Sequence, residues 1–188
     1  MTTFNTDTAL RFINAEYLPL TNTRAREVLD PATLQPVGQV GLCGEADVQA
    51  AVDAATTAQK QWRLIDAKSR AARLHQLANA IELDIACNRE VARLMTLEMG
   101  KPFPEAMGEL ANCAPIFRYY AEMARDDAGK VAGTTQIGSF QHVRYEPYGV
   151  SVHIMPFNFP ILLMCWTVAA SLAAGNACIV KPAEATTL

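Results

Sequence analysis

The chain lacks the two glycine-rich patterns with which many proteins bind nucleotide phosphates. Neither GxGxxG nor GxxxxGK(S/T) occurs in its 188 residues. In both patterns a glycine-rich turn brings backbone N–H groups up to the phosphate oxygens, so their absence excludes a P-loop and the usual dinucleotide-binding turn. A nucleotide cofactor would have to be held by other groups.

A concentrated basic surface is also missing. The 16 lysines and arginines are scattered along the chain, and 19 acidic residues outweigh them to give a net charge of −3. Binding to the phosphate backbone of a nucleic acid requires positive charge gathered on one face or along one helix. We therefore expect no nucleic-acid partner.

Paired cysteines and a targeting segment are absent as well. Five cysteines without a CxxC spacing predict free thiols in a reducing compartment rather than a disulfide framework. Residues 1–15 contain no basic start followed by an apolar core, so they do not resemble a signal peptide. The three histidines have no cysteine or carboxylate at ligand spacing, which excludes the common metal sites. We expect a cytoplasmic protein without a metal.

One long segment without charge raises the question of a membrane. Residues 156–180 contain no charged side chain, and about 20 apolar residues suffice to cross a bilayer. Pro160 predicts a helix start, however, and Gly175 predicts a helix end. The apolar helix between them has roughly 14 residues, the length of a core helix, so we expect no membrane partner.

Residues 1–129 are predicted to hold strands and then helices. The segments 11–20 and 28–42 alternate short apolar runs with turn residues, which favours strands. Apolar spacing predicts one helix at 45–62, a second capped by Asp66 and a third ended by Gly100. A long fourth helix is expected to kink at Pro115.

Beyond Gly129 the sequence becomes rich in β-branched and aromatic residues, which predicts a strand or hairpin. A strand at 150–155, a helix at 161–174 and a strand at 177–181 then form a β-α-β unit. Both strands are mainly apolar, as expected when both faces of a parallel sheet are covered. The fold class is therefore predicted to be α/β.

Two clusters follow the strands of this unit, where ligands bind in open α/β sheets. The first is Pro156, Phe157 and Asn158, and the second is Lys181, Pro182, Ala183 and Glu184. A single crossover between parallel strands places both clusters at the same edge.

Each polar member of these clusters also has an ordinary structural explanation. Asn158 alone would be a turn residue that bonds its own backbone. Lys181 alone would mark a strand leaving the sheet, and Glu184 would be an acidic residue in the first turn of a helix. Only their joint spacing indicates a binding site.

Four motifs in order give the sequence a specific resemblance. They are "EPYGV", "PFNFP", "SLAAGN" and "KPAE", which are similar to the aldehyde dehydrogenase superfamily patterns Glu-Pro-x-Gly-Val, Pro-Trp/Phe-Asn-Phe-Pro, Ala-Leu-Ala-x-Gly-Asn and Lys-Pro-x-Glu. Upstream, "FINAEY", "DPATLQPVGQV", "LEMGKPFPEAMGEL" and "RYYAEMA" resemble the family's opening segments. Ala15 stands where the family often has glycine, and Phe157 where it often has tryptophan.

The resemblance implies NAD(P)-dependent oxidation of an aldehyde to a carboxylate through a cysteine thiohemiacetal. It assigns Asn158 to the oxyanion hole and Lys181 and Glu184 to the adenosine ribose, with Met155, Pro156 and Phe157 lining the cofactor cleft beside Pro182 and Ala183. Because a carboxylate repels a 2′-phosphate, Glu184 favours NAD, with NADP possible. The implied partners are a small-molecule aldehyde and further copies of the chain in a homo-oligomer.

The resemblance is to the amino-terminal portion of the family. It implies amino-terminal strands and helices of the cofactor-binding domain at 1–133, an oligomerisation-type strand or hairpin at 134–149, and the first β-α-β of a Rossmann-like parallel sheet at 150–188. No cysteine here lies in the family's nucleophile context, and its general-base glutamate is absent. The segments "RYYAEMA" and "PFNFP" resemble those of semialdehyde-oxidising members of the family. The alternative is a non-catalytic nucleotide-binding or subunit-interaction fragment of the same fold.

Overall fold

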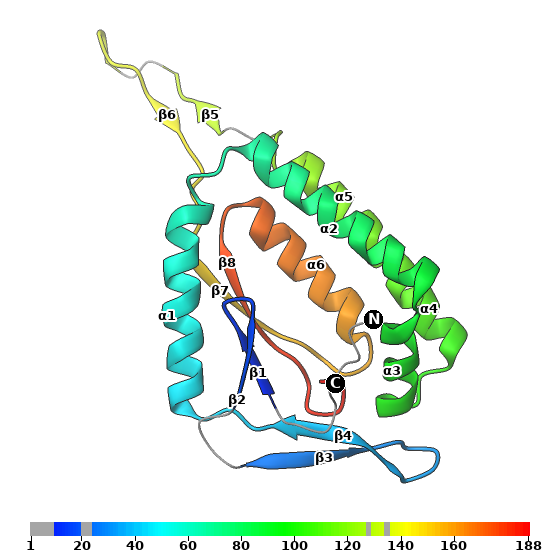
Figure 1. The fold of residues 1–188 in the computed structure, drawn as a ribbon. Helices are drawn as coiled ribbons and strands as arrows, with labels where there is room; N and C mark the ends of the chain where they lie inside the picture. The colour runs from blue at the N-terminus through cyan, green and yellow to red at the C-terminus, as the bar shows by residue number, and fades with distance from the viewer. Residues whose placement is uncertain (1–9, 20–23, 127–128, 134–135) are drawn as a thin grey trace.

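The computed structural model describes residues 10–19, 24–126, 129–133 and 136–188. Figure 1 shows the helices and strands arranged in packed layers, with helix α6 between a pair of long helices and two parallel strands. The helices are α1 (Glu45–Trp62), α2 (Ala67–Cys87), α3 (Glu90–Met99), α4 (Phe103–Ala111), α5 (Cys113–Met123) and α6 (Pro160–Ala173). The strands are β1 (Leu10–Ile13), β2 (Glu16–Pro19), β3 (Ala25–Leu29), β4 (Pro36–Gly41), β5 (Lys130–Val131), β6 (His142–Val143), β7 (Val150–Ile154) and β8 (Ala177–Lys181).

The helix ends follow the local signals of the sequence. The Asp66 carboxylate accepts the backbone N–H of Ser69 at 2.9 Å, which confirms the predicted cap of α2. Gly100 ends α3 with φ of 77°, a left-handed conformation that glycine adopts without steric cost. The predicted single fourth helix was wrong, since the structure separates α4 from α5 at Asn112. Pro115 lacks the N–H that would continue a helix across this point.

The turn between β1 and β2 contains the residue that departs from the family pattern. Asn14 and Ala15 have φ of 54° and 64°, and Ile13 pairs with Glu16 across the turn. Two successive left-handed residues are typical of a tight hairpin turn, which favours asparagine followed by glycine. Alanine therefore occupies a position whose conformation explains the family's glycine.

Two clusters of buried apolar side chains hold the helical layer together. The larger joins α2, α5 and α6, and the smaller joins α3 and α4. Ile161, in the first turn of α6, packs against both clusters. The start of α6 is therefore fixed from two directions.

The predicted β-α-β unit is confirmed. β7 and β8 pair in parallel from Val150 opposite Ala177 to Ile154 opposite Lys181, and α6 connects them. α6 packs on α2 and α5 on one side and contacts both strands on the other. Within the described ranges, no helix has both the length and the apolar character needed to cross a bilayer.

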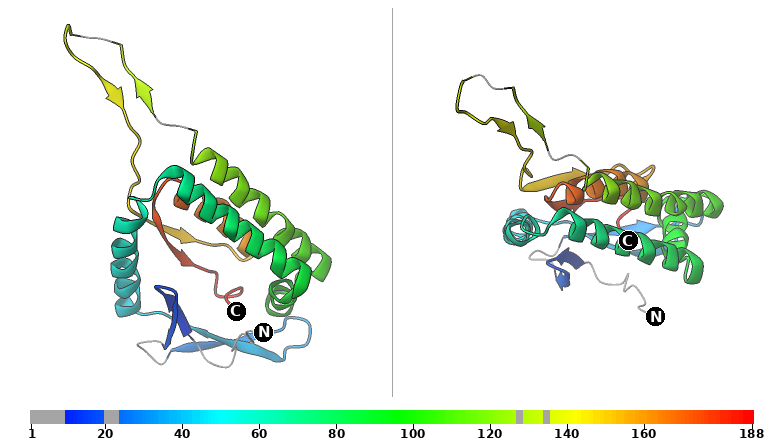
Figure 2. Two further views of the ribbon diagram at one scale, coloured as in Figure 1. Left: turned by 45° about the horizontal axis from the view of Figure 1, so that its top comes forward. Right: turned by 90° about the horizontal axis from the view of Figure 1, so that it is seen from above.

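A slender hairpin projects from the body (Figure 2), and in it Lys130 pairs with Val143 and Val131 with His142. Its apolar side chains face outward, with Ile137 100% and Phe140 77% exposed. The division of the chain at 133 and 149 remains a prediction, and residues 1–9, 20–23, 127–128 and 134–135 within it lie outside the described residues.

Candidate functional site

The ends of β7 and β8 bring the two predicted clusters to one edge. The N–H of Met155 donates to the carbonyl oxygen of Lys181 at 3.0 Å, which continues the parallel pairing past β7. Met155 is buried, whereas Phe157 is 61% exposed and Asn158 lies on the surface. The chain therefore leaves the sheet at Met155 and runs over its edge before α6 begins.

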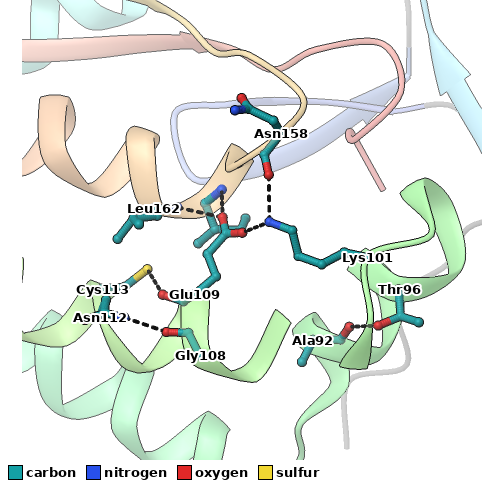
Figure 3. Close-up of polar contacts among 10 residues, drawn as sticks. Ala92, Thr96, Lys101, Gly108, Glu109, Asn112, Cys113, Asn158 and Leu162 are labelled. Atoms are coloured by element: carbon teal, nitrogen blue, oxygen red, sulfur yellow. Dashed lines mark hydrogen bonds and ion pairs between the residues drawn. The ribbon is translucent and has the colours of Figure 1, made fainter. Parts of the chain in front are cut away.

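The side chain of Asn158 points away from Lys101 and Glu109, while its carbonyl points toward the Lys101 ammonium (Figure 3). Throughout the described part of the chain, its amide has no hydrogen-bond partner. An asparagine that stabilises its own turn would bond a nearby backbone group. The structural explanation of Asn158 as a self-bonded turn residue therefore does not apply, and both amide N–H groups are open to a ligand.

A buried ion pair lies directly beneath the Asn158 loop. Lys101 and Glu109 form this pair, with side chains 6% and 0% exposed. The Lys101 ammonium also donates to the carbonyl oxygen of Asn158 at 2.7 Å and lies 4.1 Å from the centre of the Phe159 ring. The charged group thus ties the loop to the helical layer.

Glu109 also caps α6 from a distance. Its Oε1 accepts the backbone N–H groups of Ile161 and Leu162 at 2.9 and 3.0 Å. Phe159, at the N-cap position, has no side-chain group that could do this. A carboxylate at a helix amino terminus satisfies free N–H groups and interacts favourably with the helix dipole.

The sequence analysis missed this pair, although one signal was present. Glu109 shares the buried face of α4 with Ala106 and Leu110, so a charged residue stands at a core position of an apolar helix stripe. Charged residues are almost never fully buried unless they are paired. The pattern therefore indicates a buried partner, but neither Lys101 nor Glu109 was singled out within the segment "LEMGKPFPEAMGEL".

The proposed ribose-binding residues are exposed and each has a contact. The Lys181 ammonium donates to the carbonyl oxygen of Pro182 at 2.9 Å. Glu184 accepts a hydrogen bond from Arg26 of β3 at 2.7 Å, with both side chains 56% exposed. Ala183 accepts the N–H of Thr186, so Glu184 lies in a turn rather than in a helix. Arg26 was not predicted, because nothing near it in the sequence signals a partner so far along the chain.

None of the cysteines near the site has the character of a nucleophile. Cys165 is 2% exposed in the large apolar cluster. A hydrogen bond with Cys165 and burial raise the pKa of Cys113, and burial raises the pKa of Cys178. A raised pKa disfavours the nucleophilic thiolate, so neither Cys113 nor Cys178 has the setting of a reactive cysteine.

A second buried carboxyl group lies near the start of α6. Glu98 is 8% exposed and lines a small cavity of about 130 Å³ together with Pro160 and Ile161. Burial raises its pKa to about 7, although hydrogen bonds from the N–H groups of Leu188 and Thr187 oppose the change. The folded protein therefore holds a proton on Glu98 at a pH where the unfolded chain does not.

This raised pKa gives a pH-dependent stability. Below about pH 4.5 Glu98 is protonated in both the folded and the unfolded chain. Its contribution to the unfolding free energy is lost as pH rises through about 7, where the folded chain also gives up the proton. The unfolding free energy of the wild type should therefore fall by about 3 kcal/mol between about pH 4.5 and pH 7 because of Glu98. We expect the Glu98→Gln variant not to show this fall. Urea unfolding of both proteins at pH 5 and pH 8 measures the difference. Equal pH slopes for the two proteins would contradict it.

The chain is similar to known proteins over nearly its whole length. Omega-crystallin of Enteroctopus dofleini is 36% identical over 183 residues, which cover 94% of this chain and 36% of that protein. Glutarate-semialdehyde dehydrogenase of Pseudomonas putida is 37% identical over 175 residues, which cover 93% of this chain and 36% of that protein. The chain thus spans little more than a third of the length of these relatives.

Solved structures agree with the sequence relatives. The crystal structure of an E. coli NADP-dependent enzyme matches with a TM-score of 0.91 at 34% identity, over 99% of this chain and 38% of that one. Betaine aldehyde dehydrogenase of Staphylococcus aureus, in complex with NAD+, matches with a TM-score of 0.88 at 26% identity, over 95% of this chain and 36% of that one. Residues 19–188 match the aldehyde dehydrogenase family, and the chain therefore belongs to it.

Proposed function

We propose that the protein oxidises an aldehyde to a carboxylate with NAD(P)+, and that this chain supplies the oxyanion-hole amide and part of the nucleotide site. The observation that carries the proposal is the exposed amide of Asn158, which has no hydrogen-bond partner among the described residues and lies at the ends of two parallel strands. The nucleophilic cysteine and the general base are proposed to lie beyond residue 188 in the full-length enzyme.

Asn158 would act on the oxygen of the substrate. When a thiolate adds to an aldehyde, the carbonyl oxygen becomes negatively charged, and an amide N–H aimed at that oxygen stabilises the charge as it develops. A donor already fixed in place does not have to reorganise during the reaction, which makes this kind of stabilisation effective. The exposed Phe157 and Phe159 beside the amide would shield it from water once substrate is bound.

The residues after β8 fit the ribose of a nicotinamide dinucleotide, which would supply the hydride acceptor when bound. Glu184 offers an exposed carboxylate that can accept hydrogen bonds from ribose hydroxyl groups, and Lys181 offers an ammonium group at the same edge. Arg26 offsets part of the Glu184 charge, so the preference for NAD+ over NADP+ is proposed to rest on the balance between these two side chains.

Nucleotide titrations test this assignment. We expect Glu184→Gln to weaken NAD+ binding about tenfold and to narrow the ratio of the NADP+ and NAD+ dissociation constants, since a hydrogen bond to a charged group contributes about 1.5 kcal/mol. Isothermal titration of the full-length enzyme measures both constants, and Glu105→Gln, an exposed change on α4, is the matched control. Unchanged affinities in Glu184→Gln would contradict the ribose site. NAD+ binding without turnover of any aldehyde would favour a non-catalytic nucleotide-binding protein.

The projecting hairpin is the proposed contact between subunits. Its two short strands carry exposed apolar side chains away from the body, which is the character of a surface that a second copy covers. A homo-oligomer of the full-length enzyme is therefore proposed, with β5 and β6 at the interface.

A further inference from the structure

The buried pair of Lys101 and Glu109 is placed to control Asn158 rather than only to hold the core. We propose that Lys101 and Glu109 are positioning residues that set the location of the Asn158 amide, an inference that rests on the proposed oxyanion role of Asn158. Both charged groups lie on the carbonyl side of Asn158, opposite its side-chain amide (Figure 3). They act through the backbone of the loop.

Burial of the pair is a poor means of stabilising a core. Removing two charges from water costs several kcal/mol per ion, and replacement of such a pair by apolar residues is often neutral or stabilising. The Glu109 side chain is completely buried and that of Lys101 is 6% exposed. Apolar side chains at both positions would fill the same space, but they could not bond the Asn158 carbonyl.

The contacts of the pair fix the loop at its middle and at its far end. Lys101 holds the carbonyl oxygen of Asn158, and Glu109 holds the N–H groups of Ile161 and Leu162. The near end is held by the bond between Met155 and Lys181. Because the backbone is held on both sides of Asn158, the position of its Cα is fixed, and the side-chain amide can reach only a limited region.

The position of Lys101 is itself restrained. It lies between Gly100, which ends α3, and Pro102, the N-cap residue of α4. A Cβ at Gly100 would come within 2.9 Å of Pro31, and the φ of 77° disfavours other residues there. The backbone at Lys101 therefore has little freedom. This restraint helps to hold the ammonium in the position where it bonds the Asn158 carbonyl.

A displaced donor loses most of its effect, because a misplacement of about 1 Å can cost up to 100-fold in rate. The variant Lys101→Met/Glu109→Gln tests the inference without burying an unpaired charge. A glutamine oxygen can still accept the N–H groups of α6, whereas the bond to the Asn158 carbonyl is lost. We expect kcat of the full-length enzyme to fall about tenfold, with KM for the aldehyde changed less than threefold.

Combination with Asn158→Ala separates positioning from a structural effect. If the pair acts through Asn158, the triple variant has the same kcat as Asn158→Ala alone, because the effects of coupled residues do not add. If instead the fold-decrease in kcat of the triple variant equals the product of the decreases in Asn158→Ala and in Lys101→Met/Glu109→Gln, the inference is overturned. Exposed Lys68→Met and Glu105→Gln are the controls and should leave kcat unchanged.

Two further outcomes distinguish this inference from the proposed function. Wild-type kcat in Asn158→Ala would refute the oxyanion role itself. A reduced kcat in Asn158→Ala together with a wild-type kcat in Lys101→Met/Glu109→Gln would overturn only the positioning role. Should the Lys101→Met/Glu109→Gln variant fail to fold, Lys101→Arg is the second test, because it keeps the charge but displaces the Asn158 carbonyl. We expect its kcat to fall several-fold at unchanged KM, and a wild-type kcat would overturn the positioning role.

Discussion

Replacing Asn158 by alanine is expected to lower kcat of the full-length enzyme by about 100- to 1,000-fold, the usual effect of removing one oxyanion-hole donor. The substitution removes an exposed side chain without hydrogen bonds to the described residues, so the fold should be unaffected. Steady-state kinetics with a saturating aldehyde measure the loss. Thermal unfolding of the variant should match that of the wild type.

Asn158→Asp is the companion variant, since it keeps the shape of the side chain and removes both N–H donors. A carboxylate also repels a negative oxygen, so its kcat should fall at least as far as that of the alanine variant. Exposed Asn88→Ala, at the end of α2, should retain wild-type kcat. A rise in KM with unchanged kcat would show that Asn158 binds substrate and transition state equally, which contradicts the oxyanion role.

The largest expected effect on stability comes from Glu109→Ala. It leaves the Lys101 ammonium buried without its partner and frees two N–H groups at the start of α6. Loss of one member of a buried ion pair typically costs about 3–5 kcal/mol in unfolding free energy. Guanidinium chloride unfolding, monitored by circular dichroism, measures this change.

Glu105→Ala is the matched control, because it lies one turn earlier on α4 and is exposed. Its unfolding free energy should stay within about 0.5 kcal/mol of the wild type. Glu109→Gln should fall between the two, since its amide oxygen can still accept from α6. A loss below about 1 kcal/mol in Glu109→Ala would mean that the pair is solvated in solution, contrary to its burial in the structure.

Local signals explain which parts of the fold could be predicted. Asp66 and Gly100 mark helix ends through their own backbone and side-chain geometry, so the neighbouring boundaries were predicted from a few residues. The parallel unit of β7, α6 and β8 was also predictable, because two short and mainly apolar strands flank an apolar helix. The break between α4 and α5 was underestimated, since proline indicates a disturbed helix without determining its extent.

The contacts that shape the candidate site depend on distant pairs. Lys101 and Asn158 are 57 positions apart, and Arg26 and Glu184 are 158 positions apart. Such pairs form only when tertiary packing brings the elements together, and no periodicity reports them. The strand ends could therefore be predicted to lie together as a candidate site, whereas the ionic groups that contact them could not.

Ile161 packs against both apolar clusters, and its N–H is bound by Glu109. Surface turns usually open by themselves at low free energy, independently of the core. The turn that carries Asn158 is held more firmly, because its carbonyl oxygen accepts from the buried Lys101 ammonium and the helix that follows it packs on both clusters. Local opening of this turn would therefore leave a buried ammonium without its carbonyl partner, and we expect a ligand to meet an amide that is already in place rather than one that closes after binding.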